Sequence, residues 1–157
     1  ALTPYWDHNA RGVLLGLTGV HGKSHVYRAL LEGIAFEQRL LTSGAEEALG
    51  EPVTDVIALG GGSRSPVWCQ IIADVMRRKV SVVREPESTC LGAGMLAAAA
   101  VGLHESIPAA AAMMSGVSTS FEPEPQTAAT YDRLYEVYRD IYPSTRELFA
   151  RLAEATR

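Results

Sequence analysis

The sequence predicts an α/β domain in which at least part of the sheet is parallel. Two short stretches, Asp55–Leu59 and Lys79–Val83, have the length and the apolar, β-branched content of strands. Helical patterns precede, separate and follow them, and strands that alternate with helices usually form one parallel layer. At 157 residues the chain is long enough to bury one substantial core, so we expect a single domain over residues 1–157.

The chain is centred on a strand that runs into three glycines and then into a helix. Asp55–Leu59 is apolar after its first residue, which favours a buried central strand. Gly60–Gly62 allow positive φ angles and a close approach of another body, because no Cβ stands in the way. Ser65 before Pro66 predicts a capped helix start, where exposed backbone N–H groups can meet a nucleotide. A purely structural turn explains the same pattern.

The helix that starts at Pro66 has one apolar face, made of Trp68, Ile71, Ile72, Val75 and Met76. Before the central strand we expect a loop over residues 3–12, a strand at Val13–Leu17 and a second loop over residues 18–22. Apolar residues at helical spacing then predict a helix from about Ser24 to Thr42, with Gly44 and Gly50 marking its end.

Three helices are expected after the second strand. Thr89–Val101 consists mostly of small residues, and its glycines indicate close approach to a neighbouring element. Ile107–Met114 predicts a short helix and Ser115–Pro125 a loop. Thr127 should cap the last helix, in which a stripe of tyrosines is typical of core packing, and Pro143-Ser144 should break it.

Composition excludes several classes of function. The formal net charge of −4 and the lack of a dense basic patch argue against a nucleic-acid partner. No apolar run approaches 20 residues, so we expect no membrane span. Cys69 and Cys90 have no metal-type spacing, and Cys69 reads as a buried free thiol, which suits the cytoplasm. The chain does not begin with Met, and we expect a fragment or a processed product.

A second nucleotide motif competes with the glycine stretch. Gly22-Lys23-Ser24 opens the long helix and matches the end of a P-loop, in which the lysine and hydroxyl act on phosphates and Mg²⁺. The first glycine of that pattern would fall on Leu17, with Gly16 one position away, and no later strand ends in an aspartate that could hold the metal. The P-loop is therefore the weaker of the two readings.

Several motifs in one order resemble the second half of the FGGY family of carbohydrate kinases, with xylulokinase-type members nearest. They are Thr3-Pro-Tyr-Trp-Asp7 with Asn9-Ala-Arg-Gly12, Gly16-Leu-Thr18, His25–Phe36, Gly60-Gly-Gly-Ser-Arg-Ser-Pro-Val-Trp68, and Leu91-Gly-Ala-Gly-Met-Leu-Ala97. The fourth motif, with Gln70, Ala73 and Asp74 after it, resembles the family's adenosine motif. Together they span almost the whole chain.

This resemblance implies a ribonuclease-H-like C-terminal domain of the actin/hexokinase/Hsp70 superfamily, partial and with flanking helices. It implies ATP and Mg²⁺ as cofactors, with adenosine lying on Gly60, Gly61 and Gly62 and hydrogen-bonded by Ser63 and Ser65. The family's sugar or polyol site and its catalytic aspartate belong to an N-terminal half that this sequence lacks. We therefore expect neither catalytic nor metal-ligating residues here.

Two departures leave the sugar open: Ala1-Leu2 stands where the family often has Glu-Arg, and His8 stands in place of a proline. The interpretation is the C-terminal, ATP-binding portion of a cytoplasmic carbohydrate kinase, inactive without its N-terminal half. An apolar face on the Leu91–Ala100 helix, left without its cover, predicts a homodimer. The alternatives are a stand-alone nucleotide- or partner-binding module, a degenerate P-loop protein using Gly22-Lys23-Ser24, and a decayed kinase fragment.

Overall fold

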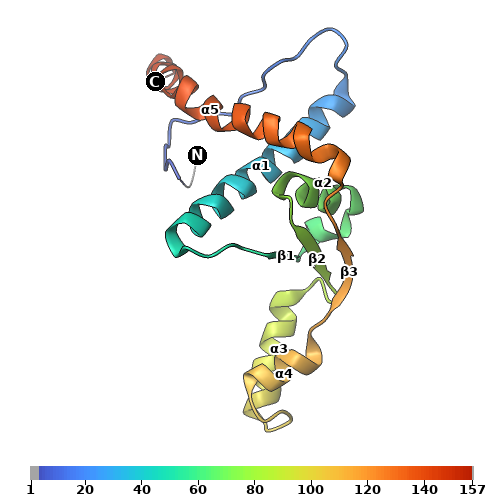
Figure 1. Ribbon diagram of the computed structural model, residues 1–157. Helices are drawn as coiled ribbons and strands as arrows, with labels where there is room; N and C mark the ends of the chain where they lie inside the picture. The colour runs from blue at the N-terminus through green and yellow to red at the C-terminus, as the bar shows by residue number, and fades with distance from the viewer. Residues whose placement is uncertain (1–3, 157) are drawn as a thin grey trace. The chain divides into compact units, whose positions relative to one another are not determined.

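The computed structural model describes residues 4–156, which fall into two compact units (Figure 1). One unit comprises Ala1–Val53 and Pro125–Arg157, and is called the helical unit below. The other, Thr54–Glu124, contains the sheet and is called the sheet unit. The chain passes from the helical unit into the sheet unit and back again.

The sheet unit has three strands in the order β1-β2-β3. β1 (Asp55–Ala58) pairs in parallel with β2 (Lys79–Val83), and β2 pairs antiparallel with β3 (Val117–Phe121). A register shift interrupts the second pairing between Val82 and Val83. The parallel pair confirms the predicted α/β class.

Helix α2 (Pro66–Met76) connects the two parallel strands and supplies most of the core. It packs on β2 and β3, and every residue from Ile71 to Met76 is buried. Ile71, Val75, Val80 and Cys69 are the largest fully buried side chains. Burial raises the pKa of the Cys69 thiol, so the prediction of a buried free thiol is confirmed.

Helix α2 is also joined to the end of β3 by two polar side chains. The buried carboxylate of Asp74 accepts the Gln70 amide at 2.9 Å and the backbone N–H of Glu124 at 2.8 Å. Gln70 also donates to the carbonyl oxygen of Glu122 at 2.9 Å. Because a buried carboxylate is costly unless it is hydrogen-bonded, these contacts fix the segment that leaves the sheet unit.

Helices α3 (Ser88–Ala100) and α4 (Ile107–Met114) form a packed hairpin within the same unit. A Cβ added at Gly94 would lie 3.7 Å from Cε of Met114, which is ordinary contact. The close approach predicted for the small-residue helix is therefore made at Gly94, and its partner is α4.

The helical unit pairs α1 (Lys23–Leu49) with α5 (Pro125–Ala155) through an aromatic cluster. The Phe36 ring centroid lies 6.0, 6.2 and 5.4 Å from those of Tyr131, Tyr135 and Tyr138. Phe36, Tyr131 and Tyr135 are buried, so the prediction that the tyrosine stripe packs in a core is confirmed for these residues.

Polar contacts flank this cluster. Arg28 donates to Glu32 at 2.7 Å and to the Tyr131 hydroxyl at 2.8 Å, and that hydroxyl donates to Glu32. Hydrogen bonds to Glu32 and Tyr131 raise the pKa of Arg28. The Arg39 guanidinium lies 4.3 Å from the Tyr135 ring centroid and pairs with Asp132 at 2.9 Å. These contacts set the register of α5 against α1.

Five predictions about individual elements are wrong. Thr127 does not cap the last helix, because α5 already begins at Pro125. Val13–Leu17 forms no strand: Gly16 has φ 77° and the side chains are exposed, because no strand lies beside the segment in the described chain. Gly44 does not end α1, since one glycine costs a helix only about 1 kcal/mol. The helix continues to Gly50, whose φ of 71° forms the cap.

Pro143 does not break α5. The Tyr142 ring before it stacks on Tyr5 at 4.0 Å, and the hydroxyl of Thr145 after it bonds the Ile141 carbonyl at 2.7 Å, so contacts on both sides offset the lost backbone bond. Residues 117–121 were predicted as a loop but form β3. The serines in this segment favoured the loop prediction.

β1 is also less buried than a central strand. It lies at an edge of the described sheet, and Ile57 on it is 62% exposed. Parallel strands are usually covered on both faces. In the described sheet, however, apolar side chains of β1 such as Ile57 remain exposed.

The core of the sheet unit can be tested by truncation. Ile71→Ala should lower the free energy of unfolding by about 2–5 kcal/mol, because it removes a fully buried side chain and leaves a cavity. Urea unfolding followed by circular dichroism measures the change. Val67→Ala on the same helix, where the side chain is 61% exposed, should change it by less than about 0.5 kcal/mol. Equal losses in the two variants would contradict this core.

Candidate nucleotide site

Residues 60–65, here called the glycine turn, join β1 to α2 and include a short 3-10 helix, η1 (Gly61–Arg64). Gly60 has φ 78° and ψ −169°, a combination that only glycine adopts readily. A Cβ added at Gly62 would lie 2.5 Å from Cζ3 of Trp68, because the indole ring packs against the bare backbone. Both glycines are therefore required by the fold itself.

Gly61 is different, because neither constraint applies to it. It is exposed, its φ lies outside the left-handed region, and a Cβ added there would meet no atom within 4 Å. The fold would accept a side chain at this position. A bare backbone facing open space is a surface on which a flat ligand can lie.

The two predicted serines use part of their hydrogen-bonding capacity within the turn. The Ser63 hydroxyl donates to the Gly60 carbonyl at 2.7 Å, and the Ser65 hydroxyl accepts from the Trp68 N–H at 3.3 Å as the helix cap. Ser63 oxygen can still accept and the Ser65 hydroxyl can still donate. A ligand at the turn would meet one acceptor and one donor.

The N-terminus of α2 offers fewer donors than the sequence suggested. Pro66 has no N–H, Ser65 caps the Trp68 N–H, and the Cys69 N–H bonds the Ser65 carbonyl at 3.0 Å. Within residues 4–156, Val67 alone in this first turn has an N–H without an acceptor. The first turn of α2 therefore contributes one such N–H to a ligand rather than a cradle of several around phosphate.

A cavity of about 180 Å³ lies beside the turn in the same unit. Leu59 and Val83, which follow or end the two parallel strands, line it together with Leu91, Gly92 and Met95 of α3. The carboxyl ends of parallel strands are where open α/β sheets usually bind ligands. Its lining is mainly apolar, so the cavity could accept an apolar ring.

Sequence reasoning missed the supports of the turn. The Trp68 ring holds Gly62 in place, and its buried indole N–H has no partner within the described residues. Gln70 and Asp74, placed in the nucleotide motif by resemblance, bond the exit of β3 instead. The short spacing from Gly62 to Trp68 was the available signal for the first contact, whereas nothing in the sequence pairs Asp74 with Glu124.

The structure also describes the competing Gly22-Lys23-Ser24 segment. Among residues 4–22 no strand precedes it, and Gly22 is the N-cap of α1. The ring nitrogen Nδ1 of His25 accepts the Gly22 N–H at 3.1 Å, and that of His21 accepts the Thr18 N–H at 2.9 Å. Two backbone donors that a P-loop would aim at phosphate are thus bonded to imidazoles.

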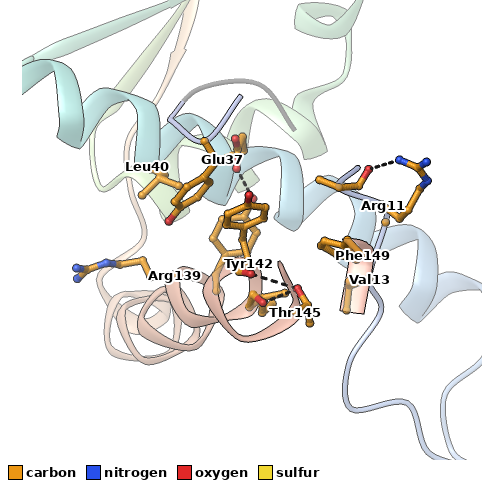
Figure 2. Close-up of a pocket in the computed structure, with 13 residues that line it drawn as sticks. Arg11, Val13, Glu37, Leu40, Arg139, Tyr142, Thr145 and Phe149 are labelled. Carbon is orange, nitrogen blue, oxygen red and sulfur yellow. Dashed lines mark hydrogen bonds between the residues drawn. The ribbon is translucent and has the colours of Figure 1, made fainter. Parts of the chain in front are cut away.

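A cavity of about 250 Å³ in the helical unit is lined mainly by aromatic and apolar side chains (Figure 2). Three of its hydroxyls are engaged: Tyr138 donates to Glu37, Tyr142 to Asp7 and Thr145 to a backbone carbonyl. Burial and the bond to Glu37 raise the pKa of Tyr138. The cavity holds no reactive pairing that assigns it a chemistry.

Other kinds of site find little support within residues 4–156. No group of three His, Cys, Asp or Glu side chains there could hold a metal ion. No helix in the described part of the chain is long and apolar enough to cross a membrane.

Comparison with known proteins adds independent evidence. The model of the C-terminal domain of the FGGY family of carbohydrate kinases matches residues 1–101. The xylulose kinase of Bacillus subtilis (strain 168) is 34% identical over 146 residues, which are 93% of this chain and 29% of that protein. The gluconokinase of the same strain is 32% identical over 154 residues, or 98% and 30%. The chain thus spans about 30% of the length of these relatives.

Solved structures agree. The ligand-bound xylulose kinase from Lactobacillus acidophilus superposes with a TM-score of 0.80 at 29% identity, covering 96% of this chain and 30% of that one. A xylulose kinase from Brucella ovis gives 0.81 at 29% identity, covering 92% and 30%. These neighbours are sugar kinases, and they confirm the predicted actin/hexokinase/Hsp70 fold in partial form. The chain belongs to the FGGY family of carbohydrate kinases, as its C-terminal domain.

Proposed function

We propose that residues 1–157 are the nucleotide-binding C-terminal domain of an ATP-dependent carbohydrate kinase, which transfers the γ-phosphate of ATP to a hydroxyl of a sugar or polyol. The domain that binds the sugar for phosphorylation and the catalytic base lie outside this chain, which is inactive alone. The relatives are named xylulose kinase, gluconokinase, ribulokinase and glycerol kinase. They share the reaction and differ in the substrate, so the proposal names a substrate class. The full-length kinase acts in the cytoplasm.

Gly61 carries the proposal. Gly60 and Gly62 are explained by backbone conformation and by Trp68, whereas Gly61 has an open surface that the fold does not require. Adenosine lies against this backbone, with its ring directed to the cavity behind Leu59. Ser63 accepts from the nucleoside and Ser65 donates to it.

Mg²⁺ would accompany the ATP phosphates, because protein sites usually hold it through one or two carboxylates plus substrate phosphates. A dedicated three-ligand metal cluster is absent from residues 4–156, and we place the carboxylates that hold Mg²⁺ in the part of the kinase outside this chain. In phosphoryl transfer most of the catalysis is positioning and charge stabilisation. The contribution of this chain is to hold the nucleotide rigidly.

Homodimerisation is part of the proposal. Leu96, Val101 and Leu103 on and after α3, and Ile107 and Met113 on α4, are 50–80% exposed. A hairpin with this much exposed apolar surface is a candidate for contact with a second copy or with the rest of the kinase.

Substitution of Gly61 tests the nucleotide site. Gly61→Val should weaken Mg-ATP binding by at least about tenfold, which corresponds to roughly 1.4 kcal/mol, because the new side chain occupies the ligand surface without strain. Calorimetric titration measures the affinity of the 157-residue chain.

Gly44→Val is the matched control, because Gly44 is also exposed and a Cβ there meets no atom within 4 Å. It should leave the affinity within about threefold. The site is refuted if the two variants bind ATP as tightly as wild type. If wild type itself fails to bind, the titration is repeated with the N-terminal part of a family member supplied.

The competing P-loop makes the opposite prediction. Lys23→Ala should change ATP affinity by less than about twofold if the glycine turn binds, and by a hundredfold or more if the lysine contacts phosphate. The same titration measures it. A large loss would replace the glycine turn with Gly22-Lys23-Ser24 as the nucleotide site.

A further inference from the structure

A second candidate site lies in the helical unit, at the loop before α1. Trp6 has φ 48°, in the left-handed region that a bulky residue rarely adopts, and its indole is 63% exposed. A bulky residue keeps this strained backbone conformation only where the contacts around it hold it in place. The contacts around Trp6 do so.

Both neighbours of Trp6 are fixed to α5. The Tyr5 ring stacks on Tyr142 with centroids 4.0 Å apart, and the Tyr142 hydroxyl donates to Asp7 at 2.8 Å. Asp7 also accepts the Asn9 N–H at 2.8 Å, and the Asn9 and Tyr142 bonds hold the pKa of its carboxyl below the ordinary value. The residues on both sides of the indole are therefore attached to α5.

A cavity of about 350 Å³ opens beside this loop, at the small end of the range for ligand pockets. Trp6, Asp7, His8, Asn9 and Arg146 line it. The side chains of His8, Asn9 and Arg146 form no hydrogen bond within residues 4–156. The cavity thus combines an aromatic face with donors and acceptors that are available to a ligand.

We propose that this cavity binds a neutral sugar or polyol, with the C–H face of the ligand on the Trp6 indole and its hydroxyls bonded by Asp7, Asn9 and Arg146. A neutral polyhydroxyl ligand both donates and accepts, so it satisfies a carboxylate, an amide and a guanidinium together. A phosphate or triphosphate would face the Asp7 carboxylate at close range, which disfavours a nucleotide. The site is separate from the glycine turn, and only the choice of sugars as probes rests on the proposed function.

The test is an NMR titration of the ¹⁵N-labelled 157-residue chain with xylulose, ribulose and glycerol, and with ATP as the charged comparison. The protein has two tryptophans, and Trp6→Phe assigns their indole N–H signals. Neutral sugars should shift the Trp6 indole and Asn9 amide signals saturably and leave the Trp68 signal unmoved. ATP should leave the Trp6 signal unmoved.

Trp6→Ala should weaken sugar binding, followed at the Asn9 amide, by about five- to tenfold, as loss of an aromatic face usually does. Arg146→Met should weaken it by about threefold. Tyr27→Ala, which removes another exposed aromatic ring of the same unit, should have no effect. The proposal is overturned if no sugar shifts the Trp6 signal, if ATP shifts it instead, or if Tyr27→Ala weakens binding as much as Trp6→Ala. Failure of the sugars to bind would leave the test of ATP binding at Gly61 unaffected.

Discussion

The packing of the Trp68 ring on the bare backbone of Gly62 organises the sheet unit. It requires a glycine at 62, and together with the left-handed Gly60 it bends the chain from β1 directly into α2. The buried side of α2, from Ile71 to Met76, is then brought onto β2 and β3. A substitution at Gly60 or Gly62 would therefore disturb the fold and the site together, whereas Gly61 separates the two.

The proposed nucleotide surface follows from this constraint. Local hydrogen bonds use one of the three sites that each of the Ser63 and Ser65 hydroxyls offers, and in the described first turn of α2 only the Val67 N–H is left without an acceptor. What is left suits a nucleoside better than a phosphate chain. The chain spans about 30% of the length of its kinase relatives. The residues that bind the phosphates and the metal ion can therefore come from the remaining part of such a kinase.

The sequence predicted elements whose signals are local. Three of these signals depend only on neighbours within one turn or strand: the cap Ser65-Pro66, the apolar face of α2 and the β-branched run of β2. Both ends of the helix Ile107–Met114 were also predicted correctly. The family was predicted from several FGGY motifs occurring in one order, because no single motif is specific enough.

The rest depends on distant partners. Val117–Phe121 is a strand because β2 lies beside it, and α5 passes Pro143 because Tyr142 contacts Tyr5 and Asp7 across more than 130 residues of sequence. Within the site, the three glycines look alike in the sequence. Only the structure separates a backbone requirement at 60 and a packing requirement at 62 from an open surface at 61.

The position of the nucleotide can be observed residue by residue by adding ADP to the ¹⁵N-labelled chain and following the backbone amide signals. Adenosine on the glycine turn predicts saturable shifts at Leu59 to Ser65 and at the Leu91–Met95 stretch that lines the adjacent cavity, with residues 18–24 unmoved. Shifts confined to residues 18–24, or spread over the helical unit with none at the turn, would contradict a nucleotide site at Gly61.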